Sequence, residues 1–330
     1  METSVTSQYL ALMISVAPMM DWTDRHCRYF MRLLSPSASL YTEMITANAL
    51  HYGDTDSLLR FDSSEHPLAI QLGGSDPVLM AEAASKAAQA GYDEVNINVG
   101  CPSDRVQNGR FGACLMAHPD IVAACVREMM AAVDVPVTVK TRIGIDDKDS
   151  DEFLGRFIGI VAEAGCRKFI VHARIAVLEG LSPKENRSIP PLNYERVYRL
   201  KEAHPDLEIV LNGGITEIQQ VDAAIEKVDG AMIGRQAYHH PYFLAELEHH
   251  MHPQCALPDR IEVIEKMIPY IEGELQQGER LGRITRHMTG LFAGLPGARA
   301  WRRYLSEHAY RENASTDVLR EALDAMPVAA

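Results

Sequence analysis

The most informative residue in this sequence is a cysteine that follows a short strand-like run. Glu94–Ile97 reads Glu-Val-Asn-Ile, which is typical of a strand, and Gly100 and Pro102 then force a loop around Cys101. A thiol on such constrained backbone, just past a strand end, could give a proton to a ligand bound above the strands. Alternatively, Cys101 is a small apolar side chain in a turn, because free cysteine is often buried. The length and polarity of the loop favour the proton donor.

Eight short apolar runs recur along the first 234 residues, and helical patterns separate most of them. The runs are Ile14–Ala17, Leu40–Thr42, Leu68–Gln71, Val95–Asn98, Val137–Lys140, Phe169–His172, Ile209–Asn212 and Ala231–Gly234. The helical patterns are Ala81–Ala90, Ile121–Ala132, Phe153–Ala164, Tyr194–Ala203 and Ile218–Glu226. Alternating strands and helices predict a parallel sheet, and this length matches a barrel of eight strand–helix units. We therefore expect an α/β fold, a (β/α)8 TIM barrel.

Polar side chains end most of these runs. They are Glu43, Gln71, Asn98, Lys140, His172, Asn212 and Arg235. Barrel enzymes place their active sites at the C-terminal ends of the strands, so these side chains should converge on one mouth. Any one of them, Glu43 in particular, could instead be a structural residue at a strand end.

Glycines after the last two runs predict a phosphate site. Gly213 and Gly214 follow the seventh run, and Gly234 and Arg235 follow the eighth. Glycines let backbone N–H groups approach an anion, and a helix that begins near Thr216 would add its positive end. This is the usual phosphate location in such barrels, and the arginine would pair with the charge. A tight turn without a ligand is the alternative.

A phosphate at this place, beside a mouth lined by Gln71, Lys140 and His172, fits FMN. Lys140 would lie near the N1–C2=O edge of the flavin, where negative charge gathers on reduction, and Gln71 would read the pyrimidine edge. Pro18–Met20, after the first run, could pack against the ring. The chain has neither a G-x-G-x-x-G motif nor a P-loop, so NADPH would visit the flavin only transiently.

Motifs along nearly the whole chain resemble, in order, those of the tRNA-dihydrouridine synthases, flavoenzymes that reduce uridine in tRNA. They are Val16–Arg25, Gln71–Gly74, Asn98–Met116, Val139–Arg142, Val171–Arg174, Asn212–Gly214 and Ile233–Arg235. Leu181–Arg187 and Pro296–Tyr304 resemble the A-type members, which act on D-loop uridines at positions 20 and 20a of tRNA.

The resemblance implies that NADPH reduces FMN, that a hydride passes to C6 of a flipped uridine, and that Cys101 gives a proton to C5. The implied FMN-binding residues are Pro18, Met19, Met20, Gln71, Lys140, His172, Asn212, Gly213, Gly214, Gly234 and Arg235. The implied tRNA contacts are Asn98, Lys184, Arg187, Arg299 and Arg302. Ile175 and Val177 stand where this subgroup leads us to expect a basic and a large aromatic residue, a change that would weaken RNA affinity without altering the reaction.

The chain is acidic, with a net charge of −13, but one C-terminal stretch is basic. Residues 280–311 carry seven arginines and a single acid, Glu307. Such a local patch can bind a phosphate backbone, although from charge alone a solvated arginine-rich helix face explains it equally well.

Beyond about Leu244 the pattern is wholly helical. The expected helices are Ile261–Glu272, Gly282–Phe292, Ala298–His308 and Thr316–Ala325. We therefore expect an FMN-binding barrel at residues 1–244 and a tRNA-binding helical bundle at 245–330, as the family also has. Arg299 and Arg302 are three apart and would share a helix face.

Several classes of protein are disfavoured. No apolar run reaches the 18 residues that a membrane span needs. The six cysteines lack C-x-x-C or paired spacing, which predicts a reducing, cytoplasmic setting. The histidines at 239, 240, 249, 250 and 252 resemble metal ligands, but surface histidines on helices are far commoner, and we expect no metal. We expect no obligate protein partner either.

Two rival functions remain open. A small-molecule FMN-barrel reductase of the dihydropyrimidine or old-yellow-enzyme (enone) type explains the barrel mouth but not the arginines of residues 280–311. A tRNA-binding folding factor with a vestigial flavin site explains the arginines, but the presence of Cys101, Lys140 and Arg235 speaks against it.

Overall fold

The computed structural model describes residues 13–103, 106 and 109–326, and every structural statement below concerns these residues. They form two compact units. The first comprises the residues up to Met20 together with Ser39–Gly234, and the second comprises Asp21–Ala38 together with the residues from Arg235 onward. The division into an FMN-binding domain at residues 1–244 and a tRNA-binding domain at 245–330 stays a prediction. Residues 1–12 of the first domain and 327–330 of the second lie outside the described residues.

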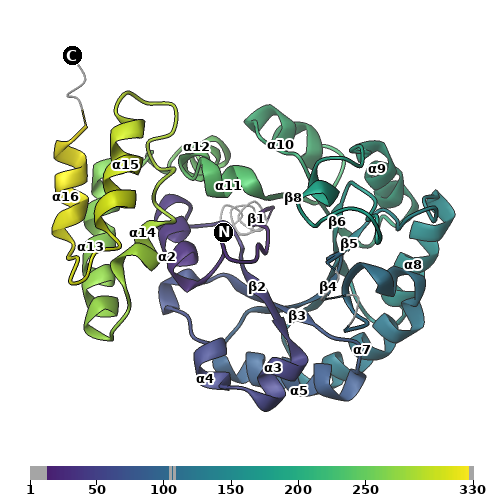
Figure 1. Ribbon diagram of the computed structural model, residues 1–330. Coiled ribbons are helices and arrows are strands. Elements are labelled where there is room, and N and C mark those ends of the chain that lie inside the picture. The colour runs from purple at the N-terminus through teal and green to yellow at the C-terminus, as the bar shows by residue number, and fades with distance from the viewer. Residues whose placement is uncertain (1–12, 104–105, 107–108, 327–330) are drawn as a thin grey trace. The chain divides into compact units, whose positions relative to one another are not determined.

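The first unit is a barrel of parallel strands, as the sequence predicts. The strands are β1 (Ile14–Val16), β2 (Leu40–Thr46), β3 (Leu68–Gly73), β4 (Glu94–Val99), β5 (Val137–Arg142), β6 (Lys168–His172), β7 (Glu208–Asn212) and β8 (Gly230–Ile233). They form one eight-stranded sheet in the order β1-β8-β7-β6-β5-β4-β3-β2 (Figure 1). A parallel bridge between Ser15 and Ser39 links β1 to the start of β2 and brings the two edges of the sheet together.

Helices connect the strands on the outside of the ring (Figure 1). They are α3 (Ala47–Tyr52), α4 (Thr55–Leu58), α5 (Pro77–Ala90), α7 (Pro119–Ala132), α8 (Asp151–Glu163), α9 (Tyr194–Ala203) and α10 (Ile218–Ile225), with short 3-10 helices η1 (Ser63–Glu65), η2 (Gly112–Ala117) and η3 (Glu185–Arg187). The sequence positions their ends through caps. Asp76 accepts from the N–H groups of Val78 and Leu79 before α5, Pro77 is its first residue, and Gly91 ends it with a φ of +101°.

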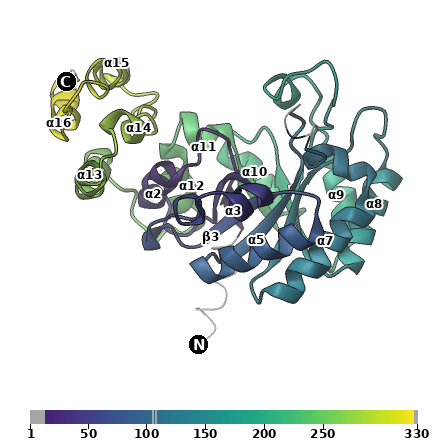
Figure 2. The same ribbon diagram turned by 60° about the horizontal axis from the view of Figure 1, so that its bottom comes forward.

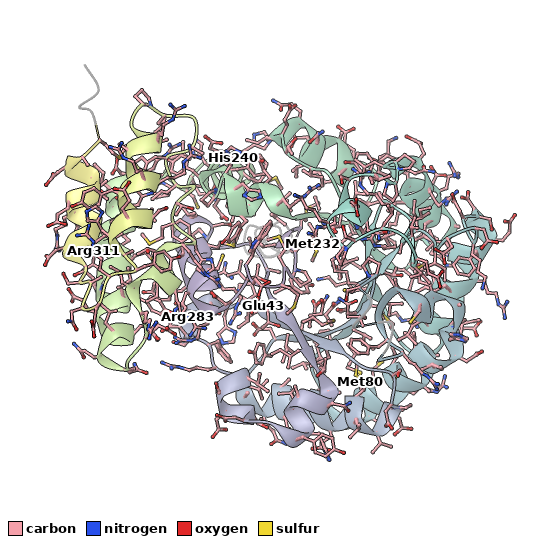
Figure 3. The ribbon with its side chains drawn as sticks, viewed as in Figure 1. Glu43, Met80, Met232, His240, Arg283 and Arg311 are labelled. Atoms are coloured by element: carbon pink, nitrogen blue, oxygen red, sulfur yellow. The ribbon has the colours of Figure 1, made fainter. Side chains whose placement is uncertain are left out.

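Every second residue of a strand points inward, because side chains alternate across a strand. A buried apolar cluster confirms this alternation, since its members come from six places around the ring: Ala17, Tyr41, Ala69, Ile170, Val210 and Met232. Met232 lies among the strands in Figure 3. Met19 packs against this cluster and so lies over the barrel core directly after β1.

The N-terminal end of the barrel is closed by charged side chains. The Glu94 carboxylate accepts from the Tyr41 hydroxyl at 2.5 Å and lies 3.1 Å from the Lys168 ammonium, which also lies 3.3 Å from Glu208. Burial disfavours the ammonium charge, but the two carboxylates outweigh it and raise the pKa of Lys168. Burial and the Glu94 charge raise the pKa of Tyr41. This end of the barrel therefore depends on one shared carboxylate.

Strand β2 differs from the expected run. It continues to Thr46, with a register shift against β3 between Tyr41 and Met44. Glu43 therefore lies within this irregular part of the strand and not at the strand end, because a bulge adds an unpaired residue that the apolar pattern does not reveal.

The second unit is helical. It comprises α2 (Arg25–Leu34), α11 (Arg235–His239), α12 (Tyr242–Met251), α13 (Arg260–Gln276), α14 (Leu281–Thr285), α15 (Ala298–His308) and α16 (Asp317–Asp324). Figure 2 shows α13 to α16 as one group. The expected helix Gly282–Phe292 is wrong beyond Thr285, where turns replace it. A Cβ at Gly290 would come within 2.5 Å of the His239 carbonyl, so this segment follows a close backbone approach instead of a helix.

The described residues contain neither a candidate membrane span nor a candidate metal cluster. None of their helices is long and apolar enough to cross a membrane. Residues 13–326, as far as they are described, contain no group of three or more His, Cys, Asp or Glu side chains suited to a metal ion. In the histidine cluster, His249 Nδ1 lies 2.7 Å from the Cys255 carbonyl, and His252 lies 4.0 Å from Glu248.

Removing the Glu94 charge tests the closed end of the barrel. Glu94→Gln keeps the size of the side chain but leaves buried Lys168 without its main counter-charge, so we expect the free energy of unfolding in urea to fall by about 1–3 kcal/mol. Glu208→Gln is the control, because its side chain is 43% exposed and its loss should cost under about 1 kcal/mol. Equal losses in the two variants would contradict this account.

Candidate active site at the mouth of the barrel

The Asn98 side chain fixes the base of the cysteine loop. Its Oδ1 accepts from the backbone N–H groups of Gly100, at 3.1 Å, and Cys101, at 2.9 Å. Its Nδ2 donates to Gln71 Oε1 at 2.7 Å. Because a backbone N–H can only donate, the oxygen of Asn98 must face the loop and its amide nitrogen must face Gln71.

That orientation extends down the barrel. Gln71 Nε2 donates to Asn96 Oδ1 at 2.8 Å, and Asn96 Nδ2 donates to Thr138 Oγ1 at 2.8 Å. The Thr138 hydroxyl donates to the Glu94 carboxylate at 2.7 Å. The backbone donors at the top and the carboxylate at the bottom require the same direction. Gln71 and Asn98 each use one amide proton in this column, so each side chain has one amide proton left to donate.

Cys101 lies partly exposed on a loop that is held on both sides. Its N–H donates to Asn98, its carbonyl accepts from the Ala113 N–H at 2.9 Å, and its thiol lies 3.5 Å from the Ser103 hydroxyl. Gly112 has a φ of +78°, and a Cβ there would come within 2.6 Å of the Cys101 carbonyl. Backbone contacts on both sides thus fix the backbone of Cys101. Part of the loop, residues 104–105 and 107–108, lies outside the described residues.

Among the described residues, no carboxylate forms an ion pair with the buried Lys140 ammonium. Its Nζ donates to Asn212 Oδ1 at 3.1 Å, and Asn212 Nδ2 donates to the Met232 carbonyl at 2.8 Å, which fixes that amide as well. Burial, and then the charge of Arg142, lower the pKa of Lys140 to about 7. An anionic ligand would offset both effects, and the lysine adds a further donor to the mouth.

The glycines after β7 and β8 have different structural reasons. Gly213 and Gly214 have φ values of +122° and +70°, and a Cβ at Gly213 would come within 2.6 Å of the His172 ring. The Tyr194 hydroxyl donates to the Gly213 carbonyl at 2.6 Å. Nothing lies within 4 Å of a Cβ built on Gly234. The backbone after β8 therefore borders open space, whereas Gly213 and Gly214 are required by their own backbone and neighbours.

The expected contribution of a helix near Thr216 is not supported. Helix α10 begins at Ile218, and the Glu217 carboxylate caps its first turn, with Gln220 reaching back. The positive end of this helix is thus already satisfied by a carboxylate. Arg235 is the exposed first residue of α11 and belongs to the second unit.

Sequence reasoning missed Arg142 as a site residue. Its Nε donates to the Gly100 carbonyl at 2.8 Å, and its Nη1 donates to the carbonyls of Ile175 at 2.9 Å and Asn186 at 3.0 Å. Burial lowers the pKa of Arg142 to about 10, so it stays charged at neutral pH. The signal was its position two residues after Lys140, which places both side chains on the inner face of β5.

The loop between β6 and α9 carries two of the expected tRNA contacts. Lys184 and Arg187 are exposed and flank buried Asn186. The Asn186 side chain accepts from the N–H of Val177 at 2.8 Å and donates to its carbonyl at 2.9 Å. At Ile175 and Val177, where the sequence departs from the family pattern, backbone groups make these hydrogen bonds, which therefore do not depend on the two side chains.

The other two expected tRNA contacts lie on α15. Arg299 and Arg302 are exposed, whereas Trp301 is buried and donates from Nε1 to the Met288 carbonyl at 3.0 Å. No ion pair joins either arginine to an acidic side chain in the part of the chain that the structure describes. Arg283 and Arg311, both exposed, are labelled in Figure 3. The basic stretch thus leaves cationic side chains available on its surface.

The expected residues therefore fall into groups. Hydrogen bonds join Gln71, Asn98 and Cys101 in one set and Lys140 and Asn212 in another, and the sheet register pairs Asn98 with Lys140. Pro18, Met19, Met20, His172 and Gly234 belong to the same unit, and Met20 is 55% exposed. Arg235, Arg299 and Arg302 belong to the helical unit.

Comparison with known proteins identifies close relatives. The family model described as "Dihydrouridine synthase (Dus)" matches residues 15–326. A tRNA-dihydrouridine(20/20a) synthase of Shewanella oneidensis is 59% identical, over 96% of this chain and 94% of the relative. Proteins of the same name from Vibrio cholerae and Escherichia coli K12 are each 56% identical, over 95% and 94% of this chain and 96% and 90% of the relatives.

A solved structure shares the fold alone. The 2-naphthoyl-CoA reductase in complex with 2-naphthoyl-CoA superposes with a TM-score of 0.57 at 10% identity, over 71% of this chain. This chain spans about half of that protein, 49% of its length. The likeness supports the barrel architecture and carries no information on substrate.

The lowered pKa of Lys140 predicts a pH-dependent stability. Between about pH 7 and the ordinary lysine value of 10.5, the unfolded chain binds more protons at this residue than the folded one, so Lys140 makes the free energy of unfolding rise with pH. In the apoprotein, Lys140→Met should gain most relative to wild type at pH 6, and the gain should shrink toward pH 10. Urea unfolding at both pH values measures it, and a difference independent of pH would contradict the burial of this charge.

Proposed function

This chain belongs to the dihydrouridine synthase family, and from that premise we propose that it reduces uridines 20 and 20a of tRNA to dihydrouridine. It is a tRNA-modifying oxidoreductase in a family of flavoenzymes. The observation that carries the proposal is the barrel mouth, in which fixed hydrogen-bond donors lie beside a thiol on a fixed loop.

The donors select the kind of ligand. Gln71 and Asn98 each have an amide proton to offer, and Lys140 adds an ammonium. The pyrimidine edge of a flavin and the ring of uracil both carry carbonyl oxygens, which accept such bonds. Because these amides cannot rotate without breaking the column down to Glu94, the recognition is preorganised and costs little reorganisation on binding.

The residues present fit FMN. The open backbone at Gly234 has room for a phosphate, with the N–H groups of Gly213 and Gly214 and the Arg235 guanidinium as further ligands. Met19, packed on the barrel core, forms a floor for the ring together with Pro18 and Met20. Lys140, His172 and Asn212 would hold the pyrimidine side. When bound, FMN supplies to C6 of the uracil a hydride taken from NADPH.

Cys101 completes the reduction by giving its thiol proton to C5 of the uracil. Asn98 and Ala113 hold its peptide groups, so the thiol stays in one place while the substrate enters. Its partial exposure lets solvent return the proton after each turnover. The uridine must leave the D-loop to reach it, because the C5–C6 bond is inaccessible within the folded RNA.

Exposed cations favour tRNA over a small molecule. Lys184 and Arg187 flank the β6–α9 loop, and Arg299 and Arg302 share a face of α15. A small-molecule reductase of the same barrel type has no use for such arginines. All six cysteines are free thiols, which fits a reducing compartment, and we place the protein in the cytoplasm with its tRNA substrate.

Replacing Cys101 separates the two half-reactions. Cys101→Ala should leave FMN reduction by NADPH nearly unchanged, because the thiol acts only on the uracil. Reduction of tRNA should fall by about 10²–10⁴, the range for loss of a general acid. Cys114→Ala is the matched control, since that partly exposed thiol donates to the Phe111 carbonyl at 3.2 Å in the same region. Equal losses in both half-reactions would make Cys101 structural.

Arg299 and Arg302 test the RNA contact. Each lost phosphate contact should lower the slope of log affinity against log salt by somewhat under one, so Arg299→Ala with Arg302→Ala should weaken tRNA binding and reduce the slope by about one to two. FMN content and NADPH oxidation without tRNA should not change. Binding equal to wild type at every salt concentration would remove α15 from the RNA-binding surface and favour the small-molecule reductase.

A further inference from the structure

The buried guanidinium of Arg142 joins two separate loops. The side chain lies at the end of β5 and the residue is 4% exposed. It donates to the Gly100 carbonyl, in the cysteine loop, and to the carbonyls of Ile175 and Asn186, in the β6–α9 loop. The acceptors that the structure gives it are thus backbone carbonyls from both loops, so its position depends on both.

Arg142 and Asn98 hold opposite sides of the same peptide group. The Gly100 carbonyl accepts from Arg142 Nε at 2.8 Å, while the Cys101 N–H of that peptide bond donates to Asn98 at 2.9 Å. Two bonds from different strands prevent this peptide plane from rotating. Because the plane leads directly into the Cα of Cys101, it restrains the position of the backbone that carries the thiol.

At its other end, Arg142 contacts a loop segment whose backbone is joined by the side chain of one residue, Asn186. Asn186 is fully buried, and its side chain bonds both backbone groups of Val177 and the carbonyl of Leu181 at 3.1 Å. Lys184 and Arg187 flank it and are exposed. A ligand that binds these two cations therefore acts on the Asn186 carbonyl, and through it on Arg142.

Electrostatic repulsion also connects the β6–α9 loop with Arg142. The positive charges of Arg187 and Arg174 act on Arg142 and, together with its burial, lower its pKa. A phosphate bound at Arg187 would neutralise this repulsion and favour the charged, hydrogen-bonded guanidinium. Occupation of the loop by an anionic backbone thus strengthens the bonds that hold the Gly100–Cys101 peptide.

We propose that Arg142 is a positioning residue that links RNA binding at Lys184 and Arg187 to the orientation of the Cys101 thiol. The inference rests on the proposed function for the identity of the RNA and of the acid. The connection between the two loops stands on the hydrogen bonds alone. An RNA that occupies the β6–α9 loop would then meet an acid that is held more firmly than in the free protein.

The first test needs neither cofactor nor RNA. Arg142→Lys keeps the charge but cannot reach both loops with one ammonium, so the rate at which iodoacetamide alkylates Cys101 should rise by about tenfold, the factor for one lost hydrogen bond to a charged group. Mass spectrometry of the Cys101 peptide measures the rate, with Cys255, in the helical unit, as the internal reference. Arg174→Lys is the matched control, because that arginine donates to the carbonyls of Ser188 and Pro190.

Asn186→Ala tests the link from the other side. It removes the bonds to Val177 and Leu181 without touching the cysteine loop, so a rise in Cys101 alkylation supports the connection even if Arg142→Lys folds poorly. Alkylation at the wild-type rate in folded Arg142→Lys and Asn186→Ala would overturn the proposal, whether or not the protein acts on tRNA.

The second test measures coupling to RNA by single-turnover reduction of tRNA. With Arg142 present, Arg187→Ala should lower the rate at saturating tRNA as well as the affinity. In the Arg142→Lys background, Arg187→Ala should lower the affinity alone, because the path to Cys101 is already broken. Equal effects of Arg187→Ala on the saturating rate in both backgrounds would contradict the coupling. If wild type fails to reduce tRNA while the alkylation results hold, the proposed function fails and the loop connection remains.

Discussion

Two backbone N–H groups, those of Gly100 and Cys101, impose a direction on the polar interior of this barrel. They can only donate, so the Asn98 oxygen must face them, and each amide beneath then has one permitted orientation down to the Glu94 carboxylate. Buried polar groups that lack partners are costly, so a reversed amide anywhere in the column would leave like groups facing each other. The cysteine loop and the column of side chains from Asn98 down to Glu94 are therefore a single hydrogen-bonded structure.

The two buried cations of the mouth have neutral hydrogen-bond acceptors. Lys140 and Arg142 are bonded to amide and carbonyl oxygens in place of carboxylates, and burial lowers the pKa of both. Such charges destabilise the empty site, and a ligand with electron-rich edges would offset that cost. The closed end of the barrel differs, because there the Lys168 ammonium has two carboxylates. The contrast between the two ends supports our proposal that a ligand binds at the mouth.

The sequence predicted what depends on local pattern. Apolar runs predicted all eight strands, and polar residues at their ends, such as Lys140 and Asn212, do meet at the mouth. Hydrogen bonds between segments that are distant in the sequence could not be predicted from local pattern. Nothing in the local sequence of Arg142 says that its acceptors come from Gly100 and Asn186. The segment after Thr285 could not be predicted either, because its turns reflect a close approach to the backbone of another segment.

Mapping of dihydrouridine in tRNA tests most directly whether this barrel mouth reduces D-loop uridines. A strain that lacks its own enzyme for these positions would be complemented with wild type or with Cys101→Ala, and tRNA would be sequenced after chemical cleavage at dihydrouridine. The account predicts that wild type restores dihydrouridine at positions 20 and 20a and that Cys101→Ala does not. Unmodified uridine at both positions in cells that express folded, FMN-loaded wild type would contradict it.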